Sequence, residues 1–190
     1  MITNGKFRIG QKLEEEVVCG SVLELGAGIF RFFNRYTAPF KVGIELIDAY
    51  IEQRVCSPNV IALQGDILRF ESVLQEAGCP SEFDTILLID IVEHLDKDGA
   101  LDVIKRAQSR CKKVIVFTPL GFEQQHGHEH VDFGRGIRLT AEQRTAAIAA
   151  QKHKSGWSPE DFDALGFDVL IDSSYHRPNL GAILAIWNVE

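Results

Sequence analysis

Short apolar runs alternate along the chain with stretches whose apolar residues recur at helical spacing. The runs end at glycine, proline or acidic residues and predict buried strands, whereas the helical spacing predicts amphipathic helices. The predicted strands are Val22–Leu25, Lys41–Leu46, Val60–Gln64, Phe83–Ile89 and Val114–Phe117. The predicted helices are Phe7–Cys19, Ile29–Tyr36, Asp48–Val55, Phe70–Ala77 and Leu101–Arg110. This alternation predicts an α/β fold, a Rossmann-like doubly wound sheet of parallel strands with helices on both faces.

The pattern changes after the fifth predicted strand. Residues 121–136 are polar, rich in histidine and punctuated by glycine, which predicts a loop or flap, and residues 139–153 are alanine-rich and predict a helix. Ser158 and Pro159 supply an N-cap and a first-turn proline for a further helix. Two last apolar runs, 167–171 and 182–187, are too close for a crossover helix and predict an antiparallel hairpin at the sheet edge.

These elements predict one domain over residues 1–190. Its parts are a core at 20–119, an insert or lid at 121–157, and a C-terminal helix and hairpin at 158–190. No apolar run approaches the ~20 residues needed to span a bilayer, and the first residues form no apolar signal segment. We therefore expect a cytoplasmic protein without a membrane partner.

The net charge and the spacing of the cysteines argue against two classes of function, nucleic-acid binding and zinc binding. The formal net charge of −7 argues against broad nucleic-acid binding, which usually leaves a basic footprint. The four cysteines, at positions 19, 56, 79 and 111, form neither a C-x-x-C pair nor a zinc spacing. They are predicted to be buried free thiols.

The first candidate site is the turn after the first predicted strand. Gly26 and Gly28 follow Leu25 and permit a tight turn, because glycine adopts positive φ without a Cβ clash. If a helix begins at Ile29, its first N–H groups face back over this turn. A strand, a glycine turn and a helix N-terminus predict a nucleotide cradle at the carboxyl edge of the sheet.

Two acidic residues follow the next strands. Glu45 ends the second predicted strand, where a carboxylate accepts hydrogen bonds from ribose hydroxyls, and Asp66 follows the third, where it accepts from an adenine amino group. A dinucleotide fingerprint requires a third glycine after Gly28, and the sequence lacks it. Taken singly, Glu45 also fits a solvated strand end and Asp66 a helix N-cap.

In this order along the chain, the motifs resemble those of the class I S-adenosylmethionine-dependent methyltransferases. They are Glu24-Leu25-Gly26-Ala27-Gly28, then Glu45, then Gly65-Asp66-Ile67, then Phe83-Asp84 through Asp90-Ile91-Val92-Glu93-His94-Leu95. The last segment is similar to one in the small-molecule branch of that family. The resemblance covers about residues 20–119, and Phe30 departs from it because the family often has a third glycine there.

The resemblance implies S-adenosylmethionine as cofactor and a set of residues that bind it. Gly26 and Gly28 would lie under the methionine portion and the ribose, and Glu45 would bind the ribose hydroxyls. Asp66 would meet the adenine amino group. The cofactor-binding residues implied in full are Glu24, Gly26, Gly28, Glu45, Leu46, Asp66, Ile67, Asp90 and Ile91.

Histidines are the candidate catalytic residues, because methyl transfer to a hydroxyl or carboxyl acceptor needs a positioned nucleophile and a base. We name His94, His128 and His153, while Glu93 and His94 also fit the start of a helix. The run His126, His128, His130 and Asp132 places imidazoles at alternate positions, which suits either a metal or a polar lid over the acceptor; no metal is predicted. Residues 153–157 are predicted to line the acceptor pocket, although Trp157 equally fits core packing.

The leading hypothesis is an enzyme that methylates a small-molecule acceptor. The short insert predicts a small acceptor, or a site completed by a second subunit in a homodimer. Two alternatives stay open: a non-catalytic S-adenosylmethionine-binding or regulatory protein of the same fold, and an NAD-dependent oxidoreductase. Methylation of RNA is disfavoured by the acidic charge balance.

Overall fold

The computed structural model describes residues 1–17, 20–57, 59–122, 137–177 and 180–189. Its strands are β1 Ile2–Asn4, β2 Ser21–Leu25, β3 Phe40–Glu45, β4 Val60–Gln64, β5 Phe83–Ile89, β6 Cys111–Pro119, β7 Asp168–Arg177 and β8 Leu180–Asn188. Its α-helices are α1 Ile9–Glu16, α2 Asp48–Glu52, α3 Phe70–Glu76, α4 Lys97–Gln108, α5 Ala141–Ala150 and α6 Pro159–Asp163. Single 3-10 turns are η1 Arg31–Asn34, η2 Ile67–Arg69 and η3 Val92–His94.

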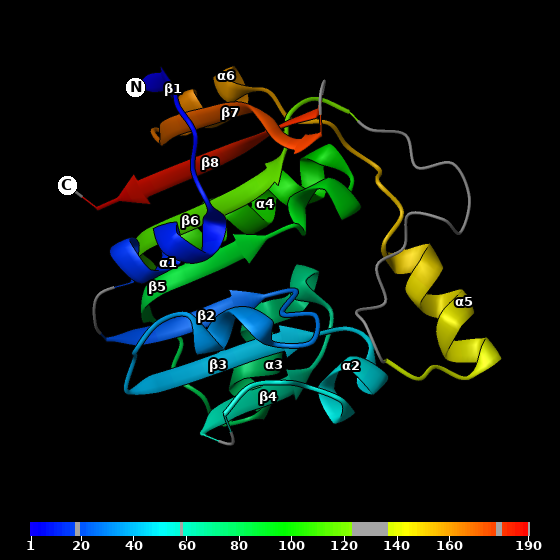
Figure 1. Ribbon diagram of the computed structural model, residues 1–190. Coiled ribbons are helices and arrows are strands. Elements are labelled where there is room, and N and C mark those ends of the chain that lie inside the picture. Colours follow the sequence, from blue (N-terminus) through cyan, green and yellow to red (C-terminus); the bar gives the residue numbers. More distant parts are fainter. Residues whose placement is uncertain (18–19, 58, 123–136, 178–179, 190) are drawn as a thin grey trace.

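One eight-stranded sheet organises the molecule, in the order β1-β7-β8-β6-β5-β2-β3-β4. All neighbouring strands pair in parallel except β8, which is antiparallel to both β6 and β7. Helices cover both faces of the sheet, with α1 on one face and α3 and α4 on the other (Figure 1). The predicted fold class and the reversed last strand are therefore confirmed.

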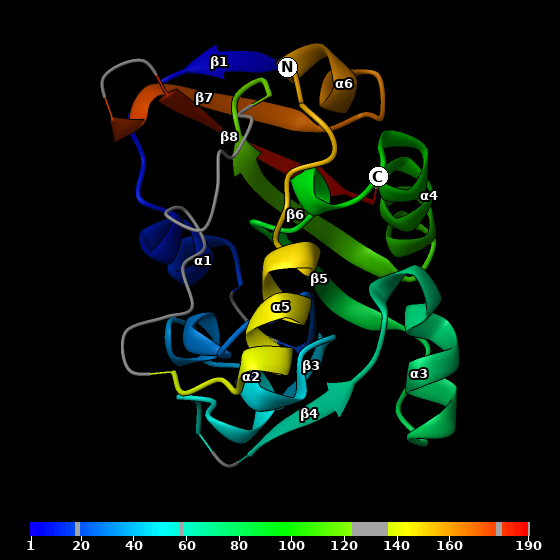
Figure 2. The same cartoon turned by 90° about the vertical axis from the view of Figure 1, so that its right-hand side faces the viewer.

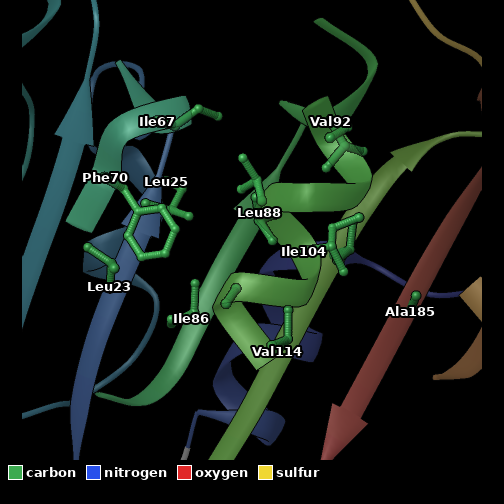
Figure 3. Packing of buried hydrophobic residues seen from close by; sticks show 14 of the residues in the cluster. Leu23, Leu25, Ile67, Phe70, Ile86, Leu88, Val92, Ile104, Val114 and Ala185 are labelled. Carbon is green, nitrogen blue, oxygen red and sulfur yellow. The ribbon is translucent and has the colours of Figure 1, made fainter. Parts of the chain in front are cut away.

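Two apolar layers lie between the sheet and the helices, one on each face of the sheet. A strand can contribute to both layers, because successive side chains of a strand point to opposite faces. Leu23 and Leu25 of β2 pack into the layer under α3 and α4, together with Phe70 (Figure 3). Val22 of the same strand packs into the layer under α1 and η1, with Phe33. The continuous apolar run of β5 contributes to both layers, as expected for a central parallel strand.

Two predictions about the fold are wrong in part. The helix predicted over residues 29–36 is only the 3-10 turn η1, so no α-helix N-terminus covers the glycine turn. The reason is that Phe30 takes a left-handed conformation (φ 63°), which an α-helix excludes. The C-terminal hairpin does not form the sheet edge, since β1 pairs in parallel with β7 and was not predicted.

The insert is described only in part, and its predicted loop lies mainly at residues 123–136, outside the described residues. Its helix α5 lies across the carboxyl edge of the sheet, beside α2 (Figure 2). Gln143 donates to Asp48 at 3.4 Å and Gln151 donates to the Tyr50 hydroxyl at 2.6 Å, which ties α5 to α2.

The described cysteines, Cys56, Cys79 and Cys111, are free thiols but are only partly buried. Cys19 lies outside the described residues. None of the helices in the described part of the chain has the length and apolar character needed to cross a membrane.

Candidate functional site

The glycine turn after β2 forms an open cradle at the carboxyl edge of the sheet. Gly26 (φ 75°) and Gly28 (φ 54°) both adopt left-handed conformations. The N–H groups of Gly26 and Ala27 donate to the carbonyl of Ile44 at 2.9 and 3.0 Å, which fixes the turn against β3. A Cβ on Gly26 would collide with Ile91, whereas a Cβ on Gly28 would meet no protein atom within 4 Å. The space above Gly28 is therefore available to a ligand.

Phe30 explains how the chain dispenses with a third glycine. It keeps the left-handed conformation that favours glycine, but its side chain is fully buried on the side of α1. Its ring stacks on Phe33 with centroids 5.7 Å apart and occupies the space that a Cβ on Gly43 would need. A bulky residue thus fits at this position without entering the cradle.

Glu45 fixes the far wall of the cradle. One carboxylate oxygen accepts from the Gly28 N–H at 2.8 Å and the other from the Ile47 N–H at 2.9 Å. Burial raises the pKa of Glu45, and these backbone hydrogen bonds oppose the rise. A carboxylate has about four acceptor positions, so the N–H groups of Gly28 and Ile47, with a smaller contribution from Leu46, leave capacity for a hydroxyl of a ligand.

Glu24 lies beneath the same turn, almost fully buried on β2. Its Oε2 is buried without a hydrogen-bond partner among the described residues. Burial raises the pKa of Glu24 to about 8, opposed by the nearby charge of Arg31 and reinforced by that of Glu45. A buried carboxyl oxygen without a partner is costly, which sets Glu24 apart from an ordinary core residue.

The residues predicted to contact an adenine ring have different environments. Leu46 follows Glu45 with 51% of its surface exposed, which leaves an apolar side chain for a ring to cover. Asp66 is exposed and accepts a hydrogen bond from the Leu68 N–H at 2.9 Å. In this structure it therefore acts as the N-cap of η2, the alternative that the sequence left open. Ile67 is buried in the core, so its side chain packs away from solvent.

Asp90 and Ile91 lie where β5 ends. Asp90 has a positive φ of 49°, which is uncommon for a non-glycine residue and marks stored backbone strain. Burial raises the pKa of Asp90 to about 6, and Arg31, whose guanidinium approaches it to 4.0 Å, opposes this rise. Ile91 packs against the Gly26 turn. These residues connect the cradle to the next cluster.

Glu93, His94 and His153 form that cluster, and their potential ligand atoms all lie within 4.8 Å of one another. The two imidazole rings meet edge to face with centroids 5.0 Å apart. Burial, reinforced by His153, lowers the pKa of His94 to about 4. Burial, reinforced by Asp90, raises the pKa of Glu93 to about 8, although the Thr118 hydroxyl donates to its Oε2 at 3.0 Å.

The structure thus brings together two of the three predicted catalytic histidines, His94 and His153. His128 lies outside the described residues, as do His126, His130 and Asp132. Glu93 was not predicted as a site residue. The sequence feature that could have identified it is its position beside His94, shortly after the end of a strand. Of the segment predicted to line the acceptor pocket, Trp157 is core: its ring stacks on Phe162 at 5.0 Å.

A groove of about 620 Å³ lies between β7 and the segment that leads into α1, and none of the predicted site residues in the described part of the chain lines it. Its charged residues include Lys6, Arg8 and Asp172. Asp172 is engaged by the N–H groups of Phe7 and Ser174 at 3.4 and 2.9 Å. Sequence reasoning missed this groove because its walls come from opposite ends of the chain.

No family model matches the chain, and no curated protein matches it in sequence. Many solved structures match its fold. The structure described as a complex of DhpI with SAH is 17% identical, covers 92% of this chain and 80% of that chain, and has a TM-score of 0.60. The chain has the fold of class I methyltransferases.

Two other solved structures with the same fold come from different proteins. Human N-acetylserotonin methyltransferase, in complex with SAM, is 14% identical over 95% of this chain and 52% of that chain, with a TM-score of 0.56. The methyltransferase domain of bacterial CtHen1-CN is 14% identical over 95% of both chains, with a TM-score of 0.53. The expected methyltransferase resemblance is therefore confirmed at the level of the fold.

Proposed function

We propose that this protein transfers a methyl group from S-adenosylmethionine to a small-molecule acceptor. The observation that carries the proposal is the open space above Gly28, bordered by the Glu45 carboxylate and close to buried Glu24, whose Oε2 has no hydrogen-bond partner among the described residues. The reversed β8 also supports a methyltransferase over a dinucleotide-binding oxidoreductase, whose sheet is mostly parallel with the order 3-2-1-4-5-6.

Each wall of the cradle has a separate role in holding the cofactor. Glu45 accepts hydrogen bonds from the ribose hydroxyls with the acceptor positions that Gly28 and Ile47 leave available. Leu46 covers one face of the adenine ring, and Asp66 accepts from the adenine amino group with the carboxylate oxygen that does not cap η2. The methionine portion follows the turn toward Asp90 and Ile91.

When bound, S-adenosylmethionine supplies a methyl carbon made electrophilic by its sulfonium. The chain must then hold an acceptor atom in line with that carbon and exclude competing water. His94 and His153 are proposed to orient the polar group of the acceptor, because they lie beyond Asp90 at the methionine end of the cradle. The acceptor is proposed to be small because the net charge of −7 argues against the broad basic footprint that RNA binding usually leaves.

Calorimetric titration with S-adenosylmethionine, S-adenosylhomocysteine and NADH tests the cofactor. We expect micromolar binding of both sulfur compounds and none of NADH; the opposite result, or no binding of either sulfur compound, would refute the proposal. Glu45→Ala should weaken binding about 5- to 150-fold, as expected for ~1–3 kcal/mol from a lost buried partner. Glu76→Ala, an exposed change on α3, is the matched control and should bind as the wild type does.

A measurement of methyl transfer distinguishes an enzyme from a protein that only binds the cofactor. An acceptor screen is read by formation of S-adenosylhomocysteine and by mass spectrometry of the methylated product. Binding of the cofactor without turnover over a broad set of small hydroxyl, carboxyl and amine acceptors would favour the binding-protein alternative.

A further inference from the structure

The Glu93–His94–His153 cluster holds more donor atoms than the positioning of an acceptor requires. A carboxylate and two imidazoles come within 4.8 Å of one another from two segments, the η3 turn and the chain after α5. Glu93 is almost fully buried and His94 and His153 are half-buried. Two interpretations of such a cluster are a network of hydrogen bonds between its side chains and a binding site for a metal ion.

His94 points to an ion. Its Nδ1 is buried and has no hydrogen-bond partner in the described part of the chain. The main-chain groups of Lys152 and Gln151 lie close enough to the ring to oppose part of the fall in the pKa of His94. A buried imidazole nitrogen that no described group satisfies is suited to ligate a metal ion.

The two segments are fixed to each other, so the cluster does not have to assemble on binding. The Glu93 carbonyl accepts from the Lys154 and Ser155 N–H groups at 2.8 and 3.1 Å. The Ser155 hydroxyl donates to the Val92 carbonyl at 3.1 Å, and the Trp157 indole donates to that hydroxyl at 3.1 Å. These bonds hold the η3 turn against the segment that follows His153, and such support lowers the cost of binding an ion.

We propose that Glu93, His94 and His153 bind a divalent transition-metal ion. Two imidazole nitrogens and one carboxylate oxygen suit Mn²⁺, Fe²⁺, Co²⁺ or Zn²⁺, whereas Mg²⁺ and Ca²⁺ prefer oxygen ligands throughout. Three protein ligands leave coordination positions open, as in sites where the metal contacts a substrate.

The position of the cluster suggests that the ion binds the methyl acceptor, and this part of the inference rests on the proposed function. Asp90 links the cluster to the cradle, since it follows β5 directly and its charge acts on Glu93. An ion held there lies at the methionine end of the cofactor site. Its open positions would hold an oxygen of the methyl acceptor, so the substrate class is a small molecule that presents a hydroxyl or carboxylate oxygen.

Metal binding is tested without cofactor or acceptor. Chelator-treated protein is titrated with Mn²⁺, Zn²⁺ and Mg²⁺ by calorimetry, and we expect one equivalent of Mn²⁺ or Zn²⁺ to bind and Mg²⁺ to bind far more weakly. His153→Asn should weaken binding by about 100-fold or more, since even a residue that only supports a ligand is worth 10–100-fold. Unchanged affinity in this variant would overturn the proposal.

The matched control is the triple variant His126→Asn, His128→Asn and His130→Asn, which removes the other histidine cluster. It should keep wild-type metal affinity, and a triple variant that loses binding would assign the metal to that cluster and refute the proposal. If His153→Asn fails to fold, pulsed EPR of the Mn²⁺-loaded wild type decides. Couplings from two histidine nitrogens are expected, and none would refute the site.

The metal site and the proposed function fail in different measurements. Protein that binds S-adenosylmethionine but neither Mn²⁺ nor Zn²⁺ would refute the metal site alone. Protein that binds the metal through His153 but neither sulfur compound would refute the methyltransferase proposal and leave the metal site standing.

Discussion

Gly28→Ala offers a direct test of whether the cradle holds the cofactor, because the chain contains a matched control. Gly28 (φ 54°) and Gly78 (φ 65°) share a left-handed conformation, and a Cβ on either would meet no protein atom within 4 Å. Gly78 lies between α3 and β5, at the amino-terminal edge of the sheet and thus opposite the cradle. The two alanine variants therefore impose the same backbone strain in different places.

The stability cost follows from the backbone alone. A left-handed conformation costs an L-residue roughly 1–2 kcal/mol, and neither new methyl group displaces a neighbour. For a chain of this size, that corresponds to a fall in melting temperature of about 2–8 °C. Thermal unfolding should give nearly the same fall for Gly28→Ala and Gly78→Ala.

Only Gly28→Ala should affect cofactor binding. Its methyl group enters the space assigned to the ligand, and inserting one carbon into a packed contact costs about 1–3 kcal/mol, or about 5- to 150-fold in affinity. Calorimetry with S-adenosylhomocysteine measures this directly. Equal affinities in Gly28→Ala and Gly78→Ala would show that the ligand does not lie over Gly28 and would refute the site.

Two further predictions concern stability. Asp84 accepts from Ser21 and from Lys112 at 2.7 Å, which lowers its pKa to about 2. Its ionised form therefore stabilises the fold fully above about pH 4, and this contribution is lost as the pH falls from about 4 toward 2. Asp84→Asn should cost about 1–2 kcal/mol in denaturant unfolding at pH 7, after discounting for its partial exposure, and the difference should shrink by pH 3; a constant difference would contradict this linkage. Phe30→Ala should cost about 3–5 kcal/mol in the same assay, because it empties a fully buried site without relieving the left-handed backbone. Phe122→Ala, at a position 58% exposed, should cost far less, and equal losses would contradict the burial argument.

The periodic parts of the chain predicted most of the fold. Apolar runs such as Phe83–Ile89 define strands by composition alone, and the capping signals of Ser158 and Pro159 correctly predicted α6. The glycine turn after β2 and the position of Glu45 at the end of β3 were also predicted correctly, because the strand pattern fixes both. Local propensity and topology agree in these segments, which is why sequence reasoning succeeds there.

The remaining features depend on contacts between distant residues. Residues 29–36 have a helical pattern, but Phe30 leaves the helical conformation and its ring fills the space over Gly43. His94 and His153 meet only because Glu93 binds the chain after α5 through its carbonyl. No local pattern encodes that bond, so the sequence identified both histidines without showing that they lie together.

The position of β1 has a consequence for how the molecule folds. The Thr3 hydroxyl donates to the Val169 carbonyl across 166 residues of sequence, and β1 completes the outer edge beside β7. The two strands can pair only after the sequence between them has been synthesised, and contacts of such long sequence separation slow folding. Until it docks, β7 presents unpaired N–H and C=O groups to any other strand. Until β1 docks, this edge of the sheet is therefore exposed to aggregation.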